Sequence, residues 1–170
     1  IQRSGATPLG ASTTTTPAGS QSYGKKDFRK DLTAIVAAHN IPYVAQTTPA
    51  HWRDLMSKVQ KAVAVDGPSF INVLSPCHRG WRCDMAISIK LMRTAVDTCY
   101  WPLYEVENGV YKINHQPKQK LPVTEFLKSQ GRFKHLFEPT EQTAVLDRLQ
   151  QGVDKEWAHL QFLASPSTTS

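Results

Sequence analysis

The chain has 170 residues, of which 40% are hydrophobic, and its formal net charge is +6. This length is enough for one domain with its own core, and no apolar run approaches the roughly 20 residues of a membrane-spanning helix. The Thr-rich N-terminus is unlike a secretory signal, and the three cysteines do not make a disulfide framework. The composition therefore predicts a cytoplasmic protein without a membrane partner.

The densest positive charge lies in the basic run from Lys25 to Lys30. A basic cluster can bind nucleic acid or an acidic protein surface. This run is short, contains Asp27, is followed by Asp31, and comes with no nucleic-acid recognition motif. It is better explained as the solvated start of a helix, and we expect no nucleic-acid partner.

Residues 1–22 consist mainly of Gly, Ser, Thr, Pro and Ala and have neither a helical nor a strand period. A loop of this length is uncommon in a compact domain and is usually either disordered or functional. The chain also begins at Ile1 rather than at a methionine. We therefore expect it to be a fragment or a processed piece of a longer protein.

Two amphipathic helices are expected in the first half of the chain. One begins at Asp27, whose side chain can cap it, and the other at Thr48-Pro49, with the Thr48 hydroxyl as the cap. Both carry apolar side chains at helical spacing, which predicts that these faces are buried. The residues expected to be buried include Phe28, Leu32, Ile35, Trp52, Met56, Val59 and Val63.

A strand is expected after each of these helices, at 42–46 and in the apolar run between the Asp66-Gly67-Pro68 turn and Pro76. The second run is apolar without clean alternation, which is typical of a strand buried on both faces. Helix, strand, helix and strand joined by short loops indicate crossover units. The predicted fold class is therefore α/β, with a parallel sheet and flanking helices.

The second half of the chain contains the clearest local pattern. Asn108-Gly109 separates two alternating runs and predicts a tight β-hairpin, because both residues tolerate positive φ. The alternation leaves one face wet, and Glu105 and Glu107 are interpreted as part of that solvated face. Further helices are expected from Asp84, with Met85 and Ile89 on the buried stripe, over 123–130, and from about Thr140.

Cys77 follows Pro76 at the carboxyl end of the strand expected between Pro68 and Pro76, where open α/β sheets place their ligands. Several interpretations of Cys77 and Cys83 are open: zinc ligands, a nucleophile with His78 as base, a redox disulfide, or one ligand of an iron–sulfur cluster. No Cys-x-x-Cys pair is present. From these residues alone, ordinary structural cysteines are the favoured interpretation.

Three stretches, taken together and in order, resemble the C-terminal half of the β subunit of the pyruvate:ferredoxin oxidoreductase (pyruvate synthase) family. The first is residues 1–8 with the Thr13–Thr16 run, the second is 67–82, and the third is 101–105 with 130–133. The resemblance covers nearly all of residues 1–137. It implies the C-terminal half of a thiamine-diphosphate-binding fold over residues 1–100, a C-terminal hairpin and helical extension over 101–164, and a disordered tail over 165–170.

The resemblance also implies cofactors and chemistry. The family's β subunit carries thiamine diphosphate, Mg²⁺ and a [4Fe–4S] cluster, and it decarboxylates a 2-oxo acid oxidatively. Electrons pass through the cluster to ferredoxin, and the acyl group passes to coenzyme A. Branched-chain 2-oxo acid enzymes share much of the pattern, and pyruvate is the expected substrate.

The resemblance assigns site roles to individual residues of this chain. Cys77 matches the family's downstream cluster cysteine and is the expected metal ligand. Ile1, Gln2 and Arg3 match the residues after the family's Asn-Thr-Gly, which places them beside thiamine diphosphate. No residue is assigned a catalytic role, and Cys83 has no counterpart.

The departures from the family concern the metal sites. The Gly-Asp-Gly and the Asn of the magnesium motif are absent, and the other cluster cysteines would lie upstream. We therefore expect Mg²⁺ and the cluster to be completed by residues outside this chain, either other subunits or a missing N-terminal half. The chain alone is expected to be inactive. The alternative is a non-catalytic interaction module that keeps the fold without cofactors.

Overall fold

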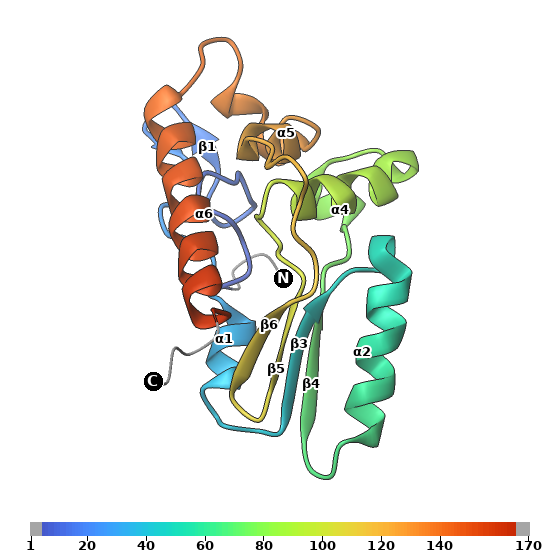
Figure 1. The fold of residues 1–170 in the computed structure, drawn as a ribbon. Helices are drawn as coiled ribbons and strands as arrows, with labels where there is room; N and C mark the ends of the chain where they lie inside the picture. The colour runs from blue at the N-terminus through green and yellow to red at the C-terminus, as the bar shows by residue number, and fades with distance from the viewer. Residues whose placement is uncertain (1–4, 166–170) are drawn as a thin grey trace.

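The structure is a computed structural model that describes residues 5–165 (Figure 1). The expected cofactor residues Ile1, Gln2 and Arg3 lie outside the described residues, as does the expected tail apart from Ser165. The helices are α1 (Leu32–Ala37), α2 (Trp52–Ala64), α3 (His78–Trp81), α4 (Ser88–Asp97), α5 (Val123–Leu127) and α6 (Thr143–Leu163), with 3₁₀ turns η1 (Pro49–His51), η2 (Met85–Ile87) and η3 (Gly131–Leu136). The strands are β1 (Ala18–Gly19), β2 (Ser22–Tyr23), β3 (Tyr43–Thr47), β4 (Ser69–Val73), β5 (Tyr104–Glu107) and β6 (Val110–Ile113).

The main sheet is mixed, with the strand order β4-β3-β5-β6. Strands β3 and β4 are parallel, as expected for a crossover through α2, whereas β5 pairs antiparallel with β3 and β6 antiparallel with β5. The expectation of a parallel sheet is therefore wrong in part. The hairpin adds to the free edge of β3, and its tight turn forces its two strands to be antiparallel. The α/β class is confirmed, and the division of the chain at residue 100 stays a prediction.

Helices α1 and α2 cover opposite faces of the sheet (Figure 1). Successive side chains of a strand point to opposite faces. Gln46 of β3 accepts a hydrogen bond from Thr33 of α1, whereas Thr47 donates one to Asp54 of α2. The C-terminal helix α6 packs at the β6 end, and its Leu160 contributes to a small apolar cluster with Val44.

The larger core lies beyond the sheet, between α4, α5, α6 and the N-terminal segment. Leu9 and Ala11 of that segment are fully buried in it. The threonine run is also structured, because Thr13 bonds the backbone N–H of Thr16 and so closes a turn. The described part of the segment without a period, residues 5–22, is therefore ordered, and Leu9 and Ala11 anchor it in the core. None of the described helices combines the length and apolar character needed to cross a bilayer.

Several local predictions are confirmed. Asn108 and Gly109 both have positive φ in the hairpin turn, and the Asp84 side chain accepts a hydrogen bond at the start of η2. Two helix starts differ from expectation. The helix expected from Asp27 begins later, at α1, where Asp31 is the cap. The Thr48 hydroxyl donates to the carbonyl of Leu74 instead of capping its own helix, and so ties the end of β4 to the end of β3.

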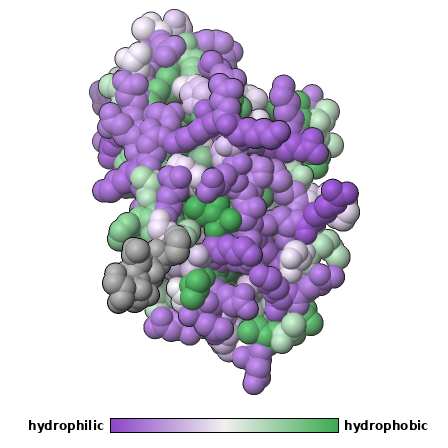
Figure 2. Space-filling view, viewed as in Figure 1, coloured by the Kyte–Doolittle hydropathy of each residue, from purple (hydrophilic) through white to green (hydrophobic). Residues whose placement is uncertain are grey.

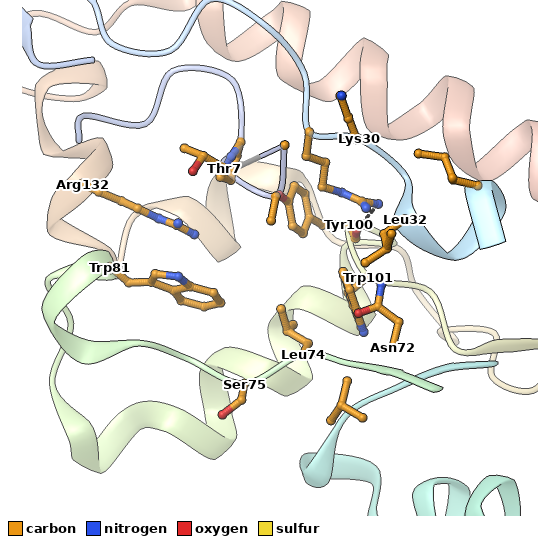
Figure 3. Close-up of a pocket in the computed structure, with 16 residues that line it drawn as sticks. Thr7, Lys30, Leu32, Asn72, Leu74, Ser75, Trp81, Tyr100, Trp101 and Arg132 are labelled. Carbon is orange, nitrogen blue, oxygen red and sulfur yellow. Dashed lines mark hydrogen bonds between the residues drawn. The ribbon is translucent and has the colours of Figure 1, made fainter. Parts of the chain in front are cut away.

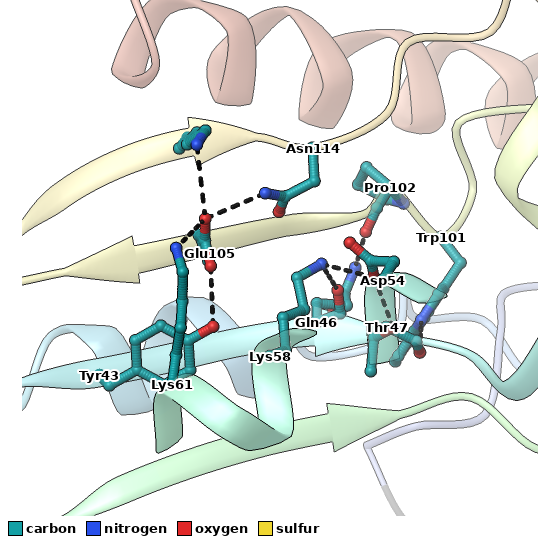
Figure 4. A network of polar contacts seen from close by, with 11 residues as sticks. Tyr43, Gln46, Thr47, Asp54, Lys58, Lys61, Trp101, Pro102, Glu105 and Asn114 are labelled. Carbon is teal, nitrogen blue, oxygen red and sulfur yellow. Dashed lines mark hydrogen bonds and ion pairs between the residues drawn. The ribbon is translucent and has the colours of Figure 1, made fainter. Parts of the chain in front are cut away.

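Glu105 lies on no solvated face, and that expectation is wrong. Its side chain is buried (residue 3% exposed) and accepts hydrogen bonds from Tyr43, Lys61 and Asn114 (Figure 4). Helix α2 packs on β3 and β4, and its Lys61 side chain reaches across to Glu105 of β5. Alternation alone does not show which face a helix from elsewhere in the chain will cover. Glu107 is exposed, as expected.

A second polar cluster joins α2 to β3. Lys58 is almost fully buried, and its ammonium group donates to the carboxylate of Asp54 at 2.8 Å and to the carbonyl oxygen of Gln46 at 2.9 Å. Burial lowers the pKa of Lys58, and the hydrogen bond to Asp54 opposes that shift. The ammonium group therefore replaces its lost hydration with two protein acceptors.

Apolar faces that were expected to be buried are exposed in several elements. On α2, Trp52 is 61% and Val63 81% exposed, although both lie on the predicted stripe. Strand β4 is an edge strand, and its last residue, Val73, is exposed, so the prediction of a strand buried on both faces is wrong. Other exposed members of the predicted stripes are Phe28, Leu32, Ile35, Met56, Val59, Met85 and Ile89.

The Glu105 cluster makes stability depend on pH. Burial opposes ionisation of Glu105, but the hydrogen bonds from Lys61, Tyr43 and Asn114 together lower its pKa from the ordinary value of 4.5. A carboxyl group with a lowered pKa stabilises the fold above its ordinary pKa, and that contribution is lost as the pH falls through the folded-state pKa.

We expect Glu105→Gln to lower the free energy of unfolding at pH 7 by about 2 kcal/mol, because it removes the charged partner of Lys61. The loss should shrink between pH 5 and pH 3, as the wild-type carboxylate becomes protonated. Urea unfolding at several pH values measures both effects. Glu107→Gln is the matched control, with an expected change below about 1 kcal/mol. Equal losses for the two variants would contradict the proposed burial of the Glu105 charge.

Candidate functional site

A cavity of about 420 Å³ lies at the carboxyl end of β4 (Figure 3). Its walls come from five places: residues 5–8, four residues between Arg29 and Ile35, residues 72–75 at the end of β4, the pair Tyr100-Trp101, and Arg132 with Trp81. Ligands of open α/β sheets bind beyond the carboxyl ends of the strands, so the position itself is typical of a binding site. Its volume is that of a small-molecule site.

The loop after β4 holds Cys77 at the surface. The backbone N–H of Leu74 bonds the carbonyl of Thr47, which continues the pairing of β3 and β4 past the end of both strands. Cys77 then serves as the N-cap of α3, and its Sγ accepts from the N–H of Gly80 at 3.4 Å. The side chain is exposed. A short rigid turn therefore presents a free thiol beside the cavity.

The other cysteines are less accessible. Cys83 is half-buried; burial raises the pKa of its thiol, and the nearby positive charge of Arg132 opposes that shift. Cys99 is buried in the larger core, and burial raises the pKa of its thiol to about 11. All three are free, so the structure contains no disulfide between Cys77 and Cys83.

Two other interpretations of the Cys77 loop find no support in the described residues. Within residues 5–165, no group of three or more His, Cys, Asp or Glu side chains is placed to hold a metal ion. The buried Nδ1 of His78 has no hydrogen-bond partner there, and no hydrogen bond joins this ring to Cys77. A zinc site built from this part of the chain and a Cys77–His78 nucleophile pair are therefore both absent.

Arg132 reaches the cavity because the 130–133 segment docks on the Cys77–Cys83 loop. The N–H of Gly131 donates to the carbonyl of Arg82 at 3.0 Å. A Cβ at Gly131 would lie 2.8 Å from the Cβ of Arg82, so only glycine permits this approach. The contact leaves the guanidinium of Arg132 over the Trp81 ring, 4.3 Å from its centroid (Figure 3).

Arg29 also lines the cavity. Its guanidinium pairs with Glu156 at 3.1 Å, donates to the carbonyl of Tyr100, and lies over the Tyr100 and Trp101 rings. It belongs to the basic run that the sequence suggests is a solvated helix start, yet its side chain is only 8% exposed. Neither Arg29 nor Arg132 was identified from the sequence as a site residue. Arg132 was contained in one of the stretches that carry the resemblance, which is the only signal that pointed to it.

The stretches that carry the resemblance converge on this one place. Residues 5–8 come from the first stretch, 72–75 and Trp81 from the second, and Trp101 and Arg132 from the third. They are far apart in the sequence and share no local motif. Their meeting around one cavity is what a common binding site predicts.

The chain is similar to oxidoreductase subunits over most of its length. It is 46% identical over 159 residues to pyruvate synthase subunit PorB of Thermotoga maritima, covering 94% of this chain and 49% of that protein. It is 44% identical over 156 residues to PorB of Methanocaldococcus jannaschii (92% and 51%) and 45% identical over 166 residues to ketoisovalerate oxidoreductase subunit VorB of Pyrococcus furiosus (96% and 52%).

The chain is a homologue of these PorB and VorB subunits over more than nine-tenths of its length. The resemblance read from the three stretches is thereby confirmed. The chain spans about half the length of the PorB and VorB relatives it matches. No family model matches it.

The cysteines should differ in reactivity in this PorB- and VorB-like chain. Because Cys77 is exposed and the other two thiols are shielded with raised pKa values, we expect iodoacetamide at pH 8 to alkylate Cys77 first, Cys83 more slowly, and Cys99 only on unfolding. Peptide mass spectrometry over a time course measures the order. If Cys99 in the folded chain were labelled as fast as Cys77, the result would contradict the burial of Cys99 in the core and the exposure of Cys77 on its loop.

Proposed function

We propose that this chain is part of the β subunit of a 2-oxo acid:ferredoxin oxidoreductase that acts on pyruvate. In the proposed reaction, carbon dioxide leaves the oxo acid, an electron pair passes to ferredoxin, and the acyl group joins coenzyme A. The observation that supports this best is the meeting of the three stretches around a cavity beside an exposed cysteine. Pyruvate is proposed because the PorB relatives are named pyruvate synthase subunits. We also propose that the protein works in the cytoplasm.

Cys77 fits one ligand position of the proposed [4Fe–4S] cluster. Its thiol is free and exposed, it lies on a short turn between β4 and α3, and the N–H of Gly80 points at its sulfur. Hydrogen bonds to cluster sulfurs tune the reduction potential of such centres. When bound, the cluster would accept and pass on single electrons. Its remaining ligands must come from outside the described residues.

Thiamine diphosphate would supply the carbanion chemistry of the decarboxylation. We propose that Ile1, Gln2 and Arg3 lie beside it and that its Mg²⁺ is held by residues beyond this chain. The described residues that follow them, 5–8, line the cavity at the end of β4. That placement is consistent with a cofactor bound close to this cavity.

We further propose that the polypeptide corresponding to the rest of the relatives' length completes the sheet at β4. The edge of β4 that faces away from β3 pairs with no described strand, and its five residues carry no charge or proline to discourage pairing. An edge of this kind is a template for another strand.

The helices on both faces of the sheet carry exposed apolar side chains near this edge. On α2, the residues that contact β3 and β5, such as Lys58 and Lys61, lie on one side of the helix, while Met56, Val59 and Val63 lie on the side turned away from β5. On α1, the exposed Leu32 and Ile35 line the cavity together with Val73 of β4. These residues would become core once a strand and its flanking helices cover them.

The face shown in Figure 2 is largely hydrophilic, with small hydrophobic areas between hydrophilic side chains. We propose this occupant because the matched relatives are about twice as long as this chain. Each of them therefore contains a region of about the same length as this chain that has no counterpart in it. The other subunits, ferredoxin, the 2-oxo acid and coenzyme A would then bind to the completed assembly.

The alternative is a non-catalytic module that keeps the fold without cofactors. It is favoured by one observation, the absence of a complete metal-binding group within residues 5–165. The two proposals differ in what they expect of Cys77. A cluster ligand cannot be replaced without consequence, whereas a surface cysteine of an interaction module can.

The proposed cluster is tested on the complex isolated anaerobically from its own cells. We expect the dithionite-reduced complex to give the electron paramagnetic resonance signal of a [4Fe–4S] cluster, and Cys77→Ser to abolish or alter it. Cys83→Ser is the matched control, with the same substitution in the same loop, and should leave the signal in place. An unchanged spectrum in Cys77→Ser would remove this residue from the cluster and favour the non-catalytic module.

The proposed completion of the sheet is tested by hydrogen exchange of backbone amides in the chain alone and in the same complex. We expect slower exchange of β4 and α2 in the complex, because the open edge becomes paired and the helix face covered. Strand β6 is the opposite edge of the same sheet and serves as an internal control. Met56→Glu should weaken the association at least about tenfold, because it places a charge in the covered face. Equal exchange of β4 in both samples would contradict the proposal.

A further inference from the structure

The cavity beside β4 has an excess of positive charge. Arg29, Lys30 and Arg132 line it, and none of the described residues in its wall is acidic. Arg29 has a counter-ion in Glu156. Arg132 forms no ion pair with any carboxylate in the described part of the chain, so its charge is not neutralised by the protein around it.

Arg132 is also buried and firmly held. The residue is 3% exposed, and its Nε donates a hydrogen bond to Oε1 of Gln130 at 2.9 Å. Its outer guanidinium nitrogens have no hydrogen-bonded acceptor among residues 5–165. Its carbonyl accepts from the N–H of Ser12, so the segment cannot swing outward without losing that bond. Figure 3 shows the side chain extending over Trp81 toward the interior of the cavity. Burial lowers the pKa of Arg132 to about 10, as expected of a desolvated cation without a counter-ion.

We propose that this cavity binds an oxyanion, a carboxylate or phosphate group of a small ligand, through the guanidinium of Arg132. A guanidinium presents paired N–H donors that match two oxygens of such a group. Lys30, exposed at the rim, adds long-range attraction. Trp81, Tyr100 and Trp101 offer ring surfaces, so the ligand carries a planar or apolar body beside its charge.

The proposal rests on the charge and shape of the cavity and does not depend on a cluster at Cys77. The carboxylate of a 2-oxo acid and the phosphate of a cofactor share the required chemistry. The two sources are distinguished by titrating the full chain separately with pyruvate and with inorganic phosphate. Tryptophan fluorescence reports binding, because Trp81 and Trp101 line the cavity.

We expect one of the two anions to bind saturably, and Arg132→Met to raise its dissociation constant at least about tenfold. Arg132→Lys keeps the charge but loses the paired donors and should give a smaller rise. The matched control is Arg148→Met, the same substitution at an exposed arginine outside the cavity, which should bind like the wild type. Pyruvate binding assigns a carboxylate ligand, and phosphate binding assigns a phosphate-bearing one.

The proposal is overturned if the folded wild-type chain binds neither anion, or if Arg132→Met and Arg148→Met bind equally well. Circular dichroism establishes that each variant is folded. Should Arg132→Met fail to fold, Lys30→Met takes its place, with an expected rise of roughly two- to fivefold over the Arg148→Met control. No rise in that variant would also overturn the proposal. Anion binding and the cluster signal are separate measurements. Anion binding can therefore be absent while the cluster signal of the complex is present, and the cluster signal can be absent while the anion binds.

Discussion

The arrangement of this chain depends on strand β3, all five residues of which are buried. A buried strand needs a partner for every polar group it carries. Tyr43 donates to Glu105 of β5, Gln46 accepts from Thr33 of α1, and Thr47 donates to Asp54 of α2. The indole N–H of Trp101 donates to the carbonyl of Thr47 at 2.9 Å. These bonds tie β3 to the helices on both faces, to the hairpin, and to one wall of the cavity.

The position of the candidate site follows from that strand. Because β4 pairs in register with β3 from Ser69 to Val73, the residues after Val73 emerge beside the end of β3. Thr48 holds Leu74 there, and a few residues later Cys77 begins α3. The docking of Gly131 on Arg82 brings Arg132 to the same place. The polar groups of β3 therefore fix one part of the cavity wall, and the contact between Gly131 and Arg82 fixes another.

Local structure was largely predictable, and burial was not. The Asn108-Gly109 turn and the helix expected from about Thr140 are properties of short segments, and both are confirmed. The burial of Glu105 could not be predicted from its own segment. Its ion-pair partner Lys61 lies 44 positions away in the sequence, and no local pattern predicts that contact. Of the site, only Cys77 was named from the sequence and described in the structure. Arg29 and Arg132 acquire a role through tertiary contacts alone.

The exposed stripes of α1 and α2 are a different kind of discrepancy. Met56, Val59 and Val63 have the spacing of core residues and lie on the surface. Helical periodicity predicts an apolar face but not the element that covers it, and the chain spans about half the length of its relatives. The proposed completion of the sheet at β4 would cover these side chains.

Electron transfer that depends on a 2-oxo acid is the most direct measurement of the proposed role. The complex is isolated anaerobically through a tag on this chain and supplied with pyruvate, coenzyme A and a viologen acceptor. We predict that viologen is reduced, and that Cys77→Ser suppresses the reduction at least about a hundredfold because electrons lose their path out of the site. Equal rates for Cys77→Ser and the wild type, or no reduction with any 2-oxo acid, would contradict the assignment of this chain to a working oxidoreductase site.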